Sequence, residues 1–309
     1  MATPQPAIFN EMGRNQWYVH LSRTDGADLG HIKGVLRDSI NAAGGQPGMN
    51  LCIGFGPTLN EALNGPGVSD FQPYETFVSG DGSGREAKGT QEELLLWYNG
   101  PDKDMIWEMQ FNARTALEGH MAVARETPTF IWRDSWDFTG FVDGTGNPEE
   151  HRQPEVALIP DGETGAGGSF AIAQRWVHDL TAFNAQSLDE QEAVFGRKKA
   201  PATEKTATIP ATSHLAHVEL REDGNHGNEG SGKRNEIARR STPYAFHDGT
   251  VGLYFMAFCK EQAPLRERMN LMYNTDGTGV RDQLTDFSNP ASGSFYFMPS
   301  VEDMNSMLA

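Results

Sequence analysis

Cysteine is scarce in this chain of 309 residues, which contains only Cys52 and Cys259. No CxxC or CxxCH spacing occurs, so the chain has neither a zinc ribbon nor the attachment motif of a covalently bound c-type haem. Each cysteine lies in an apolar run, LCIGFG or FMAFCK. We therefore expect both to be small core residues, and nothing in their spacing implies a disulfide.

Basic residues are also few. The chain has 25 Lys and Arg against 42 Asp and Glu, a formal net charge of −17. Binding to nucleic acid requires clustered Lys and Arg, and the nearest such run, GKRNEIARR at 232–240, is too short to form a binding face. We expect no nucleic-acid partner, and the acidity weakly favours neutral or cationic substrates.

Long apolar runs are absent. No stretch approaches the roughly 18 apolar residues of a membrane span. The N-terminal stretch MATPQPAIFNEMGRNQ has no basic region followed by an apolar one, as a secretory signal would have. We therefore expect no membrane partner and a cytoplasmic location.

The residues that are present indicate a globular protein with many turns. Apolar residues make up 38% of the chain, including 17 Phe and 6 Trp, which is enough for a sizeable core. There are 34 Gly and 17 Pro, which favour many turns over long helices. The length suits one large domain or two of ordinary size.

Hydrophobic periodicity predicts a repeated order of elements. In the first half it predicts strands over 16–23, 49–56 and 128–141, a strand or a short helix running into one over 90–100, and helices over 31–43 and 102–119, the last with Asp102 as N-cap and Gly119 as stop. In the second half it predicts strands over 168–176, 213–221, 252–260 and 293–300, and helices over 180–197 and 263–274.

The first-half order is strand, helix, strand, strand, helix, strand, which is the ferredoxin-like βαββαβ unit. We therefore predict an α+β protein of two ferredoxin-like units with antiparallel sheets, residues 1–150 and 151–309. A polar, glycine-rich loop is expected from Glu222 to Asn235.

Three stretches contain candidates for chemistry, and each has a simpler structural interpretation. In GFVDGTGNP, Asp143 sits in a glycine-rich turn, where an aspartate usually serves the turn itself. In ATSHLAHVEL, a strand would point His214 to the apolar side and His217 to the charged side, so a metal pair is not expected there. His214 is then either a core residue or a single axial ligand. In EIARRSTPYAF, Arg239 and Arg240 could be a solvated pair.

Together and in this order, these stretches resemble the dye-decolorizing peroxidases. The resemblance rests on GFVDG at 140–144, TSH at 212–214, IARRSTPY at 237–244 and GLYF at 252–255, and continues through the closing stretch 281–300. It spans the whole chain and looks closest to the compact bacterial branch often called type B. It implies a duplicated ferredoxin-like fold with a haem pocket in the C-terminal half.

The resemblance implies one haem b per chain, with its iron ligated by His214. It makes Asp143 the distal acid–base residue, Arg239 its distal partner and Ser241 a small polar neighbour. The first unit then contains the distal aspartate, and the second contains the proximal histidine and the distal arginine. The further cofactor contacts that it implies are Thr145, Gly146, Asn147 and Phe255, with Asp282 as an acceptor for the other nitrogen of His214.

The implied activity is a peroxidase that reduces hydrogen peroxide and oxidises one-electron donors such as dyes, phenolics and small reductants through a ferryl intermediate. The residue types suit that chemistry. A carboxylate can move a proton from one peroxide oxygen to the other, and a guanidinium stabilises the leaving hydroxide at any relevant pH. Tryptophans and tyrosines could conduct electrons to a buried haem, but the sequence does not select among them.

Two other functions remain open at this point. The first is a haem-handling protein that transfers haem or removes its iron without peroxidase turnover. The second is a haem-free scaffold acting through its sheets. The resemblance also implies a homo-oligomer, a dimer or higher. Because the chain ends at SVEDMNSMLA, directly after its last predicted strand, we do not expect it to be encapsulin cargo.

Overall fold

The computed structural model describes residues 2–202, 204–219 and 235–309, and its centre is one antiparallel sheet. Nine strands of the described chain take part, in the order β6-β1-β5-β2-β11-β7-β10-β8, with β9 also paired to β10. They are β1 (Asn15–Arg23), β2 (Asn50–Phe55), β5 (Leu94–Gly100), β6 (Met121–Phe130), β7 (Ser169–His178), β8 (Ala238–Arg239), β9 (Thr242–Ala245), β10 (Val251–Cys259) and β11 (Ser288–Met298).

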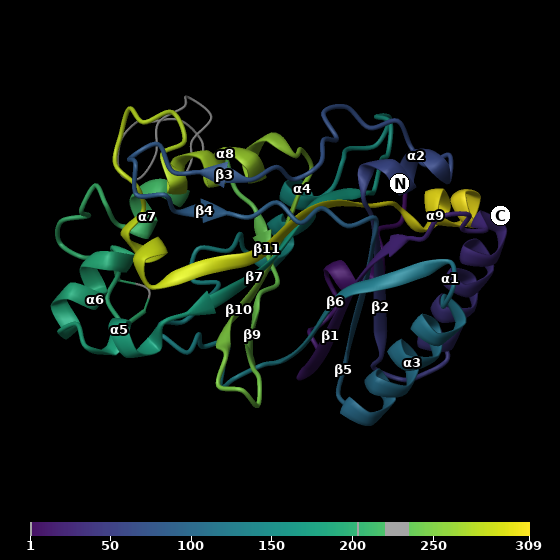
Figure 1. Cartoon of the computed structure of the whole chain (residues 1–309), viewed down its shortest axis with the longest axis horizontal. Helices are drawn as coiled ribbons and strands as arrows, with labels where there is room; N and C mark the ends of the chain where they lie inside the picture. The colour runs from purple at the N-terminus through teal and green to yellow at the C-terminus, as the bar shows by residue number, and fades with distance from the viewer. Residues whose placement is uncertain (1, 203, 220–234) are drawn as a thin grey trace.

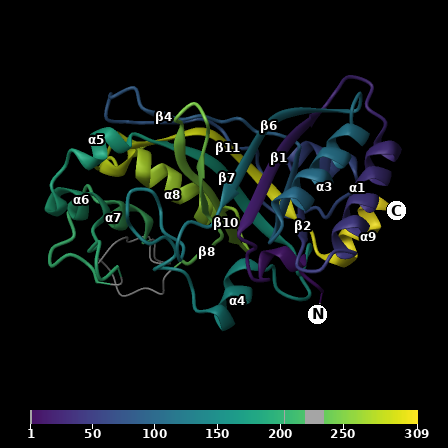
Figure 2. The same cartoon turned by 90° about the horizontal axis from the view of Figure 1, so that it is seen from below.

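The helices gather at two opposite ends of an elongated molecule (Figure 1). One end holds α1 (Leu29–Gly44), α3 (Lys103–Ala116) and α9 (Val301–Leu308), with α2 (Pro57–Ala62) nearby. Figure 2 shows the other end from below, with α5 (Leu180–Asn184), α6 (Leu188–Phe195), α7 (His214–Val218) and α8 (Ala263–Tyr273). The remaining elements are α4 (Gln153–Ala157) and the small sheet of β3 (Phe77–Val78) and β4 (Glu86–Ala87).

The strand order shows the predicted repeat. In β6-β1-β5-β2 the strands of the first set lie in the order fourth, first, third, second, if the small β3–β4 sheet is set aside. In β11-β7-β10 followed by β8 and β9, the second set has the same order, its second strand being interrupted. The predicted fold class, an α+β arrangement of ferredoxin-like units, is confirmed.

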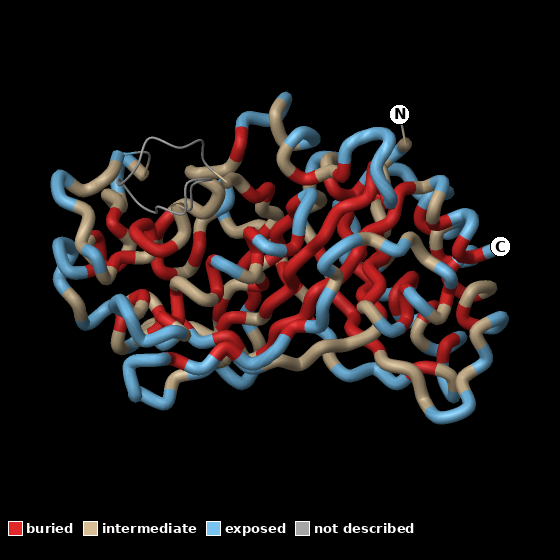
Figure 3. The backbone as a smooth tube through the Cα atoms, turned by 90° about the horizontal axis from the view of Figure 1, so that it is seen from above, coloured by how far each residue is buried: buried red, intermediate tan, exposed pale blue. Residues whose placement is uncertain are grey.

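The two sets of strands face each other across a shared core. Alternate side chains of a strand point to opposite faces, so each strand contributes to an inner and an outer layer. The inner layer joins Tyr18 and Trp97 of the first set to Tyr254, Phe258 and Tyr296 of the second. Buried backbone runs through the strands at the centre of the molecule (Figure 3).

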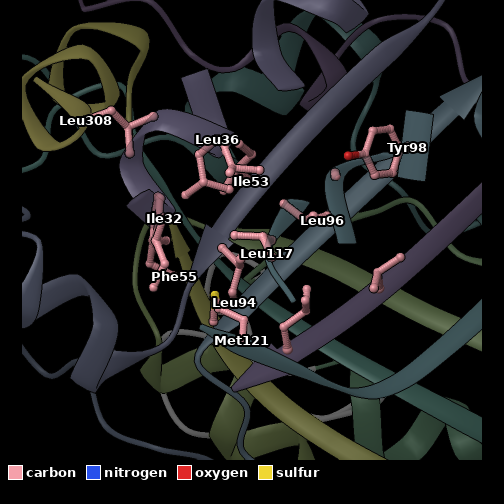
Figure 4. Close-up of a cluster of buried hydrophobic side chains, with 14 of the residues drawn as sticks. Ile32, Leu36, Ile53, Phe55, Leu94, Leu96, Tyr98, Leu117, Met121 and Leu308 are labelled. Carbon is pink, nitrogen blue, oxygen red and sulfur yellow. The ribbon is translucent and has the colours of Figure 1, made fainter. Parts of the chain in front are cut away.

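The outer layers pack under the helices. Figure 4 shows the layer beneath α1, where Ile32 and Leu36 are spaced along one helical face and meet Ile53 and Leu96 of the sheet. Asp28 begins α1, since its carboxylate accepts the backbone N–H groups of residues 30 and 31. A separate outer layer lies beneath α8 at the other end.

The predicted strand over 213–221 is wrong in its described part. Residues 214–218 form the short helix α7, and residues 220 and 221 lie outside the described residues. Ser213 caps this helix by accepting the Ala216 N–H, and Gly196, with a left-handed φ of 75°, lies against it. The alternation of apolar and polar residues in this segment fits a strand and also fits one turn of helix. The contacts of Ser213 and Gly196 favour the helix.

Three other predicted elements have different limits. The strand expected over 128–141 runs instead from Met121 to Phe130, and the residues after it form turns. The helix expected over 180–197 is two helices, because Ser187 begins α6 with a reciprocal capping box to Glu190. The segment 90–100 becomes a strand only from Leu94.

The remaining expectations about composition agree with the structure where it describes them. Cys52 and Cys259 are buried, as predicted, and both are free thiols. Among the described residues no helix is long and apolar enough to cross a membrane. The loop predicted over 222–235 lies outside the described residues, except for Asn235.

Replacing Ile53 with alanine should destabilise the fold by about 2–5 kcal/mol, because Ile53 is fully buried and the deletion leaves a cavity under α1. The matched control is Val123→Ala, since Val123 is 41% exposed on β6 and should change stability by at most about 0.5 kcal/mol. Urea denaturation of both variants measures the difference. Equal midpoints would contradict the assignment of Ile53 to the core.

Candidate active site

One cavity brings together side chains from segments far apart in the sequence. Its lining residues run from Asp137 to Ser288, and its empty volume, including the open mouth, is about 1570 Å³. The walls are mainly apolar and include Leu253 and Phe255 of β10 and Met272 of α8. Most of the predicted site residues line this cavity, namely Asp143, Thr145, Gly146, His214, Arg239 and Phe255.

Asp143 is presented by a tight turn after β6. Gly140 and Gly144 have φ values of 84° and 86°, a left-handed backbone that favours glycine, which explains the glycines around this aspartate. The Gly144 N–H donates to Asp143 Oδ1 at 2.8 Å, and the Asp143 N–H donates to the Ser135 carbonyl at 2.9 Å. The aspartate thus serves its turn and still lines the cavity.

Arg239 lies beside this aspartate. Its Nε is 3.7 Å from Asp143 Oδ1, and the two side chains are 19% and 25% exposed. The Nε is buried and has no hydrogen-bond partner within the described part of the chain. A buried donor without a partner lowers stability unless a ligand accepts its hydrogen bond. Arg239 is therefore half-buried and directed to the cavity, not a solvated surface residue.

Asn147 holds the turn to β8. Its side-chain oxygen accepts the Arg239 N–H at 2.9 Å, and its side-chain nitrogen donates to the Arg239 carbonyl at 3.1 Å. Asn147 does not itself line the cavity. Its observed contacts therefore position Arg239 relative to Asp143.

His214 is the first residue of α7 and is held by a buried carboxylate. Its Nδ1 is 2.7 Å from Asp282 Oδ2, and Asp282 is 0% exposed. Asp282 also accepts the Leu284 N–H at 2.9 Å, which orients the carboxylate. A carboxylate on Nδ1 leaves Nε2 with its lone pair and makes it a better ligand.

Two other predictions in this region had different outcomes. His214 and His217 share one turn of helix, so the predicted separation on two strand faces is wrong. His217 is 3% exposed and bonds to the carbonyls of Ser213 and Val280, at 2.8 Å each. Ser241 is buried between β8 and β9 and does not line the cavity, and its hydroxyl has no partner within the described residues.

A series of buried polar residues in the cavity wall was not predicted from the sequence. His178 Nε2 is 3.0 Å from Asp137 Oδ2, and His178 Nδ1 is 2.7 Å from Ser288 Oγ. Asp137 also accepts the Thr139 N–H at 2.8 Å, and its backbone bonds to Phe141 and Gly140. These bonds shape the turn that presents Asp143. The D-x-T pattern at 137–139 signals such a turn, but no sequence pattern links it to His178.

Comparison with known proteins identifies the family. The model of the family described as "Dyp-type peroxidase, C-terminal" matches residues 134–303, more than half of the chain. The chain belongs to the Dyp-type peroxidase family. It is therefore a haem-dependent peroxidase, and the resemblance inferred from the four sequence blocks is confirmed.

Individual relatives agree with the family assignment. A dye-decolorizing peroxidase of Brevibacterium linens is 27% identical over 89% of this chain and 73% of its own length. One from Mycobacterium tuberculosis is 26% identical over 92% of this chain and 85% of its own length. Among solved structures, the dye-decolorizing protein from V. cholerae has a TM-score of 0.85 and 28% identity, covering 97% of this chain and 99% of its own. A DypB variant of Rhodococcus jostii RHA1 in complex with heme has a TM-score of 0.86 and 25% identity, covering 98% of each chain.

The cavity of this peroxidase suits a haem in the chemistry of its walls. Haem is a flat apolar ring with two carboxylates, and apolar walls beside the guanidinium groups of Arg197, Arg239 and Arg268 match both parts. Burial lowers the pKa of Arg268 to about 10, which still leaves it cationic at neutral pH. His214 offers the nitrogen ligand that haem iron accepts.

Asp137→Asn should lower stability most at neutral pH. Burial alone would raise the pKa of Asp137, but His178 and Thr139 outweigh burial and hold the pKa below its ordinary value. The ionised carboxylate therefore adds stability above the unfolded pKa of about 3.9, and this is lost as the pH falls through the folded pKa.

The measurement is the urea midpoint of wild type and D137N from about pH 7 down to about pH 3, across the range where the carboxylate titrates. The gap between them should narrow below about pH 4. D134N, which changes an exposed aspartate three residues earlier, is the matched control and should follow wild type. A gap of constant size at every pH would contradict the linkage.

Proposed function

We propose that this peroxidase binds one haem b per chain with His214 Nε2 as the iron ligand, and that Asp143 and Arg239 act on hydrogen peroxide. The observation that supports this most is that Asp143 lies 3.7 Å from Arg239 Nε, which has no hydrogen-bond partner among the described residues, in the cavity that His214 also lines. The substrates proposed are hydrogen peroxide and one-electron donors such as dyes, phenolics and small reductants.

The haem supplies the redox chemistry that cleaves the O–O bond, and the protein supplies protons, orientation and charge. A carboxylate oxygen of Asp143 accepts a proton from one peroxide oxygen and returns it to the other, so that the leaving group departs as water. Arg239 stabilises the negative charge that develops on that oxygen and holds the carboxylate in place. Asn147 fixes the backbone of Arg239 during this transfer.

Asp282 is proposed to tune the proximal side. Its carboxylate accepts a hydrogen bond from the Nδ1–H group of His214, and this bond increases the electron density on Nε2. A more basic ligand favours the oxidised states of the iron. Phe255, Thr145 and Gly146 complete the proposed cofactor contacts through the cavity wall, and Ser241 remains a proposed polar neighbour of the distal pair.

Haem handling without turnover is the weaker alternative. It needs the histidine and the apolar walls, but gives no role to an aspartate and an arginine that share the same cavity.

Three further features of the protein are also proposed. They are a division of the chain near residue 150, a homo-oligomeric assembly and a cytoplasmic location. Light scattering of the purified protein tests the assembly, and cell fractionation tests the location.

An absorption spectrum before and after one equivalent of hydrogen peroxide tests the function. We expect the Soret band to shift within milliseconds after peroxide is added. It should return to its original position when a phenolic donor is added. A band that only bleaches slowly would instead support haem handling. No Soret band after haem supplementation would refute the cofactor assignment.

Asp143→Asn should slow peroxide-dependent donor oxidation by about 10²–10⁴-fold, because the amide cannot carry the proton. Stopped-flow mixing with peroxide isolates the step, and D134N on the preceding turn is the control that should keep wild-type rates. D143N with full turnover would assign the proton transfer to another group.

His214→Ala should abolish the spectrum of a histidine-ligated haem, because no other nitrogen ligand is proposed in the cavity. His151→Ala is the control, since the His151 side chain is 74% exposed and does not line the cavity. Far-UV circular dichroism checks that both variants fold. A stoichiometric histidine-type haem spectrum in H214A would refute the ligand assignment.

A further inference from the structure

A second group of polar aromatic residues lies inside the shared core, apart from the cavity lining. The His20 ring lies between two tyrosines, with Nε2 2.7 Å from the Tyr254 hydroxyl and Nδ1 2.7 Å from the Tyr296 hydroxyl. We call these three residues the Tyr–His–Tyr cluster. They come from β1, β10 and β11, so the cluster joins the two sets of strands.

The cluster is buried and lies among aromatic rings. His20 is 2% exposed, Tyr254 1% and Tyr296 0%. The Tyr18 ring stacks on Tyr254 with centroids 3.6 Å apart and planes 16° apart, and Trp97 continues the stack 5.8 Å from Tyr18. The indole N–H of Trp97 and the hydroxyl of Tyr18 both donate to Gln16.

Burial lowers the pKa of His20 well below its ordinary value, and the positive charges of Arg125 and Arg175 lower it further. His20 is therefore neutral, with one N–H and one free lone pair. Its N–H donates a hydrogen bond to one tyrosine oxygen, and its other ring nitrogen accepts a hydrogen bond from the hydroxyl of the other tyrosine. A hydrogen bond of 2.7 Å is within the distance over which a base accepts a proton directly.

The cluster and the cavity lie on opposite faces of the strand β10. Leu253 and Phe255, the neighbours of Tyr254 along β10, both line the cavity. Successive side chains of a strand point to opposite faces, so Tyr254 points from the same strand into the shared core. Tyr254 is therefore the member of the cluster whose two neighbours along its strand both line the cavity.

We propose that Tyr254 is a redox-active residue that gives one electron to the cofactor after peroxide has oxidised it, while its hydroxyl proton passes to His20. This rests on the proposed peroxidase function, which supplies the oxidant. Tyr254 loses one electron and one proton and becomes a neutral phenoxyl radical, and the cofactor gains the electron. His20 gains the proton at Nε2 and becomes an imidazolium held between two phenol oxygens.

The surroundings explain why the proton must have an acceptor and why the step reverses. An oxidised phenol is a strong acid, and a charged phenol left in this buried core would be very costly. His20 removes that charge from the phenol. Burial and the two arginines disfavour the imidazolium, so the proton returns to the phenol oxygen when a one-electron donor reduces the radical.

Electron paramagnetic resonance of the haem-loaded protein, frozen after mixing with one equivalent of peroxide and no donor, tests the inference. We expect a tyrosyl signal that narrows when the protein contains ring-deuterated tyrosine. Tyr254→Phe should lose this signal. Tyr273→Phe is the matched control and should keep it, since Tyr273 is equally buried next to a cavity residue but its hydroxyl has no partner in the described chain.

Two further variants separate the proton acceptor from the aromatic packing. His20→Gln keeps an amide that can hydrogen-bond but cannot take up a proton, so the signal should be lost although Tyr254 remains. Tyr296→Phe removes the other hydroxyl and should leave the signal present. A persistent signal in Y254F or H20Q, or a signal lost only in Y296F, would overturn the proposal.

The same samples distinguish failure of the inference from failure of the function. A Soret band that responds to peroxide in the wild type, without a tyrosyl signal, refutes the role of Tyr254 alone. A wild type whose Soret band does not respond at all refutes the peroxidase function and, with it, the inference.

Discussion

The reciprocal hydrogen bonds between Asn147 and the backbone of Arg239 are the contact on which the arrangement of the site depends. They join a turn that follows β6 to a strand 92 residues later in the chain. Each such bond contributes only about 0.5–1.5 kcal/mol, so their value lies in geometry rather than in overall stability. They link the turn that holds the carboxylate directly to the short strand that holds the guanidinium, while β8 is held in turn by its pairing with β10.

The same logic applies to both ends of the cavity. Asp137 and His178 hold the turn from behind, and Asp282 holds His214 from behind. In the first case a histidine at the end of β7 holds a carboxylate that lies on a turn. In the second case a buried carboxylate holds a histidine that is the first residue of a short helix. The cavity therefore has rigid polar supports although most of its surface is apolar. Such support is what a site needs when small displacements weaken catalysis.

Sequence patterns predicted the long elements and missed the local ones, for a physical reason. β1 and β10 span nine residues each and are largely buried, and an apolar pattern of that length leaves little ambiguity. α7 has five residues, and its conformation depends on the cap at Ser213 and on contact with Gly196, which no periodicity contains. Asp143, His214 and Arg239 were found through family motifs. The hydrogen bonds that link Asp137, His178 and Ser288 join three segments that are distant in the sequence, so no local pattern could have revealed them.

β10 links the catalytic cavity to the interior of the protein. Its outer face contributes Leu253 and Phe255 to the cavity, and its inner face places Tyr254 against His20 and Tyr18. An ordinary core would fill this inner position with an aliphatic side chain, which needs no partner. A phenol buried there requires an acceptor, and the acceptor is a histidine that must itself be satisfied by a second phenol. Three polar residues on three strands are thus required where one leucine would suffice for packing, and this requirement is the physical basis for assigning the cluster a chemical role.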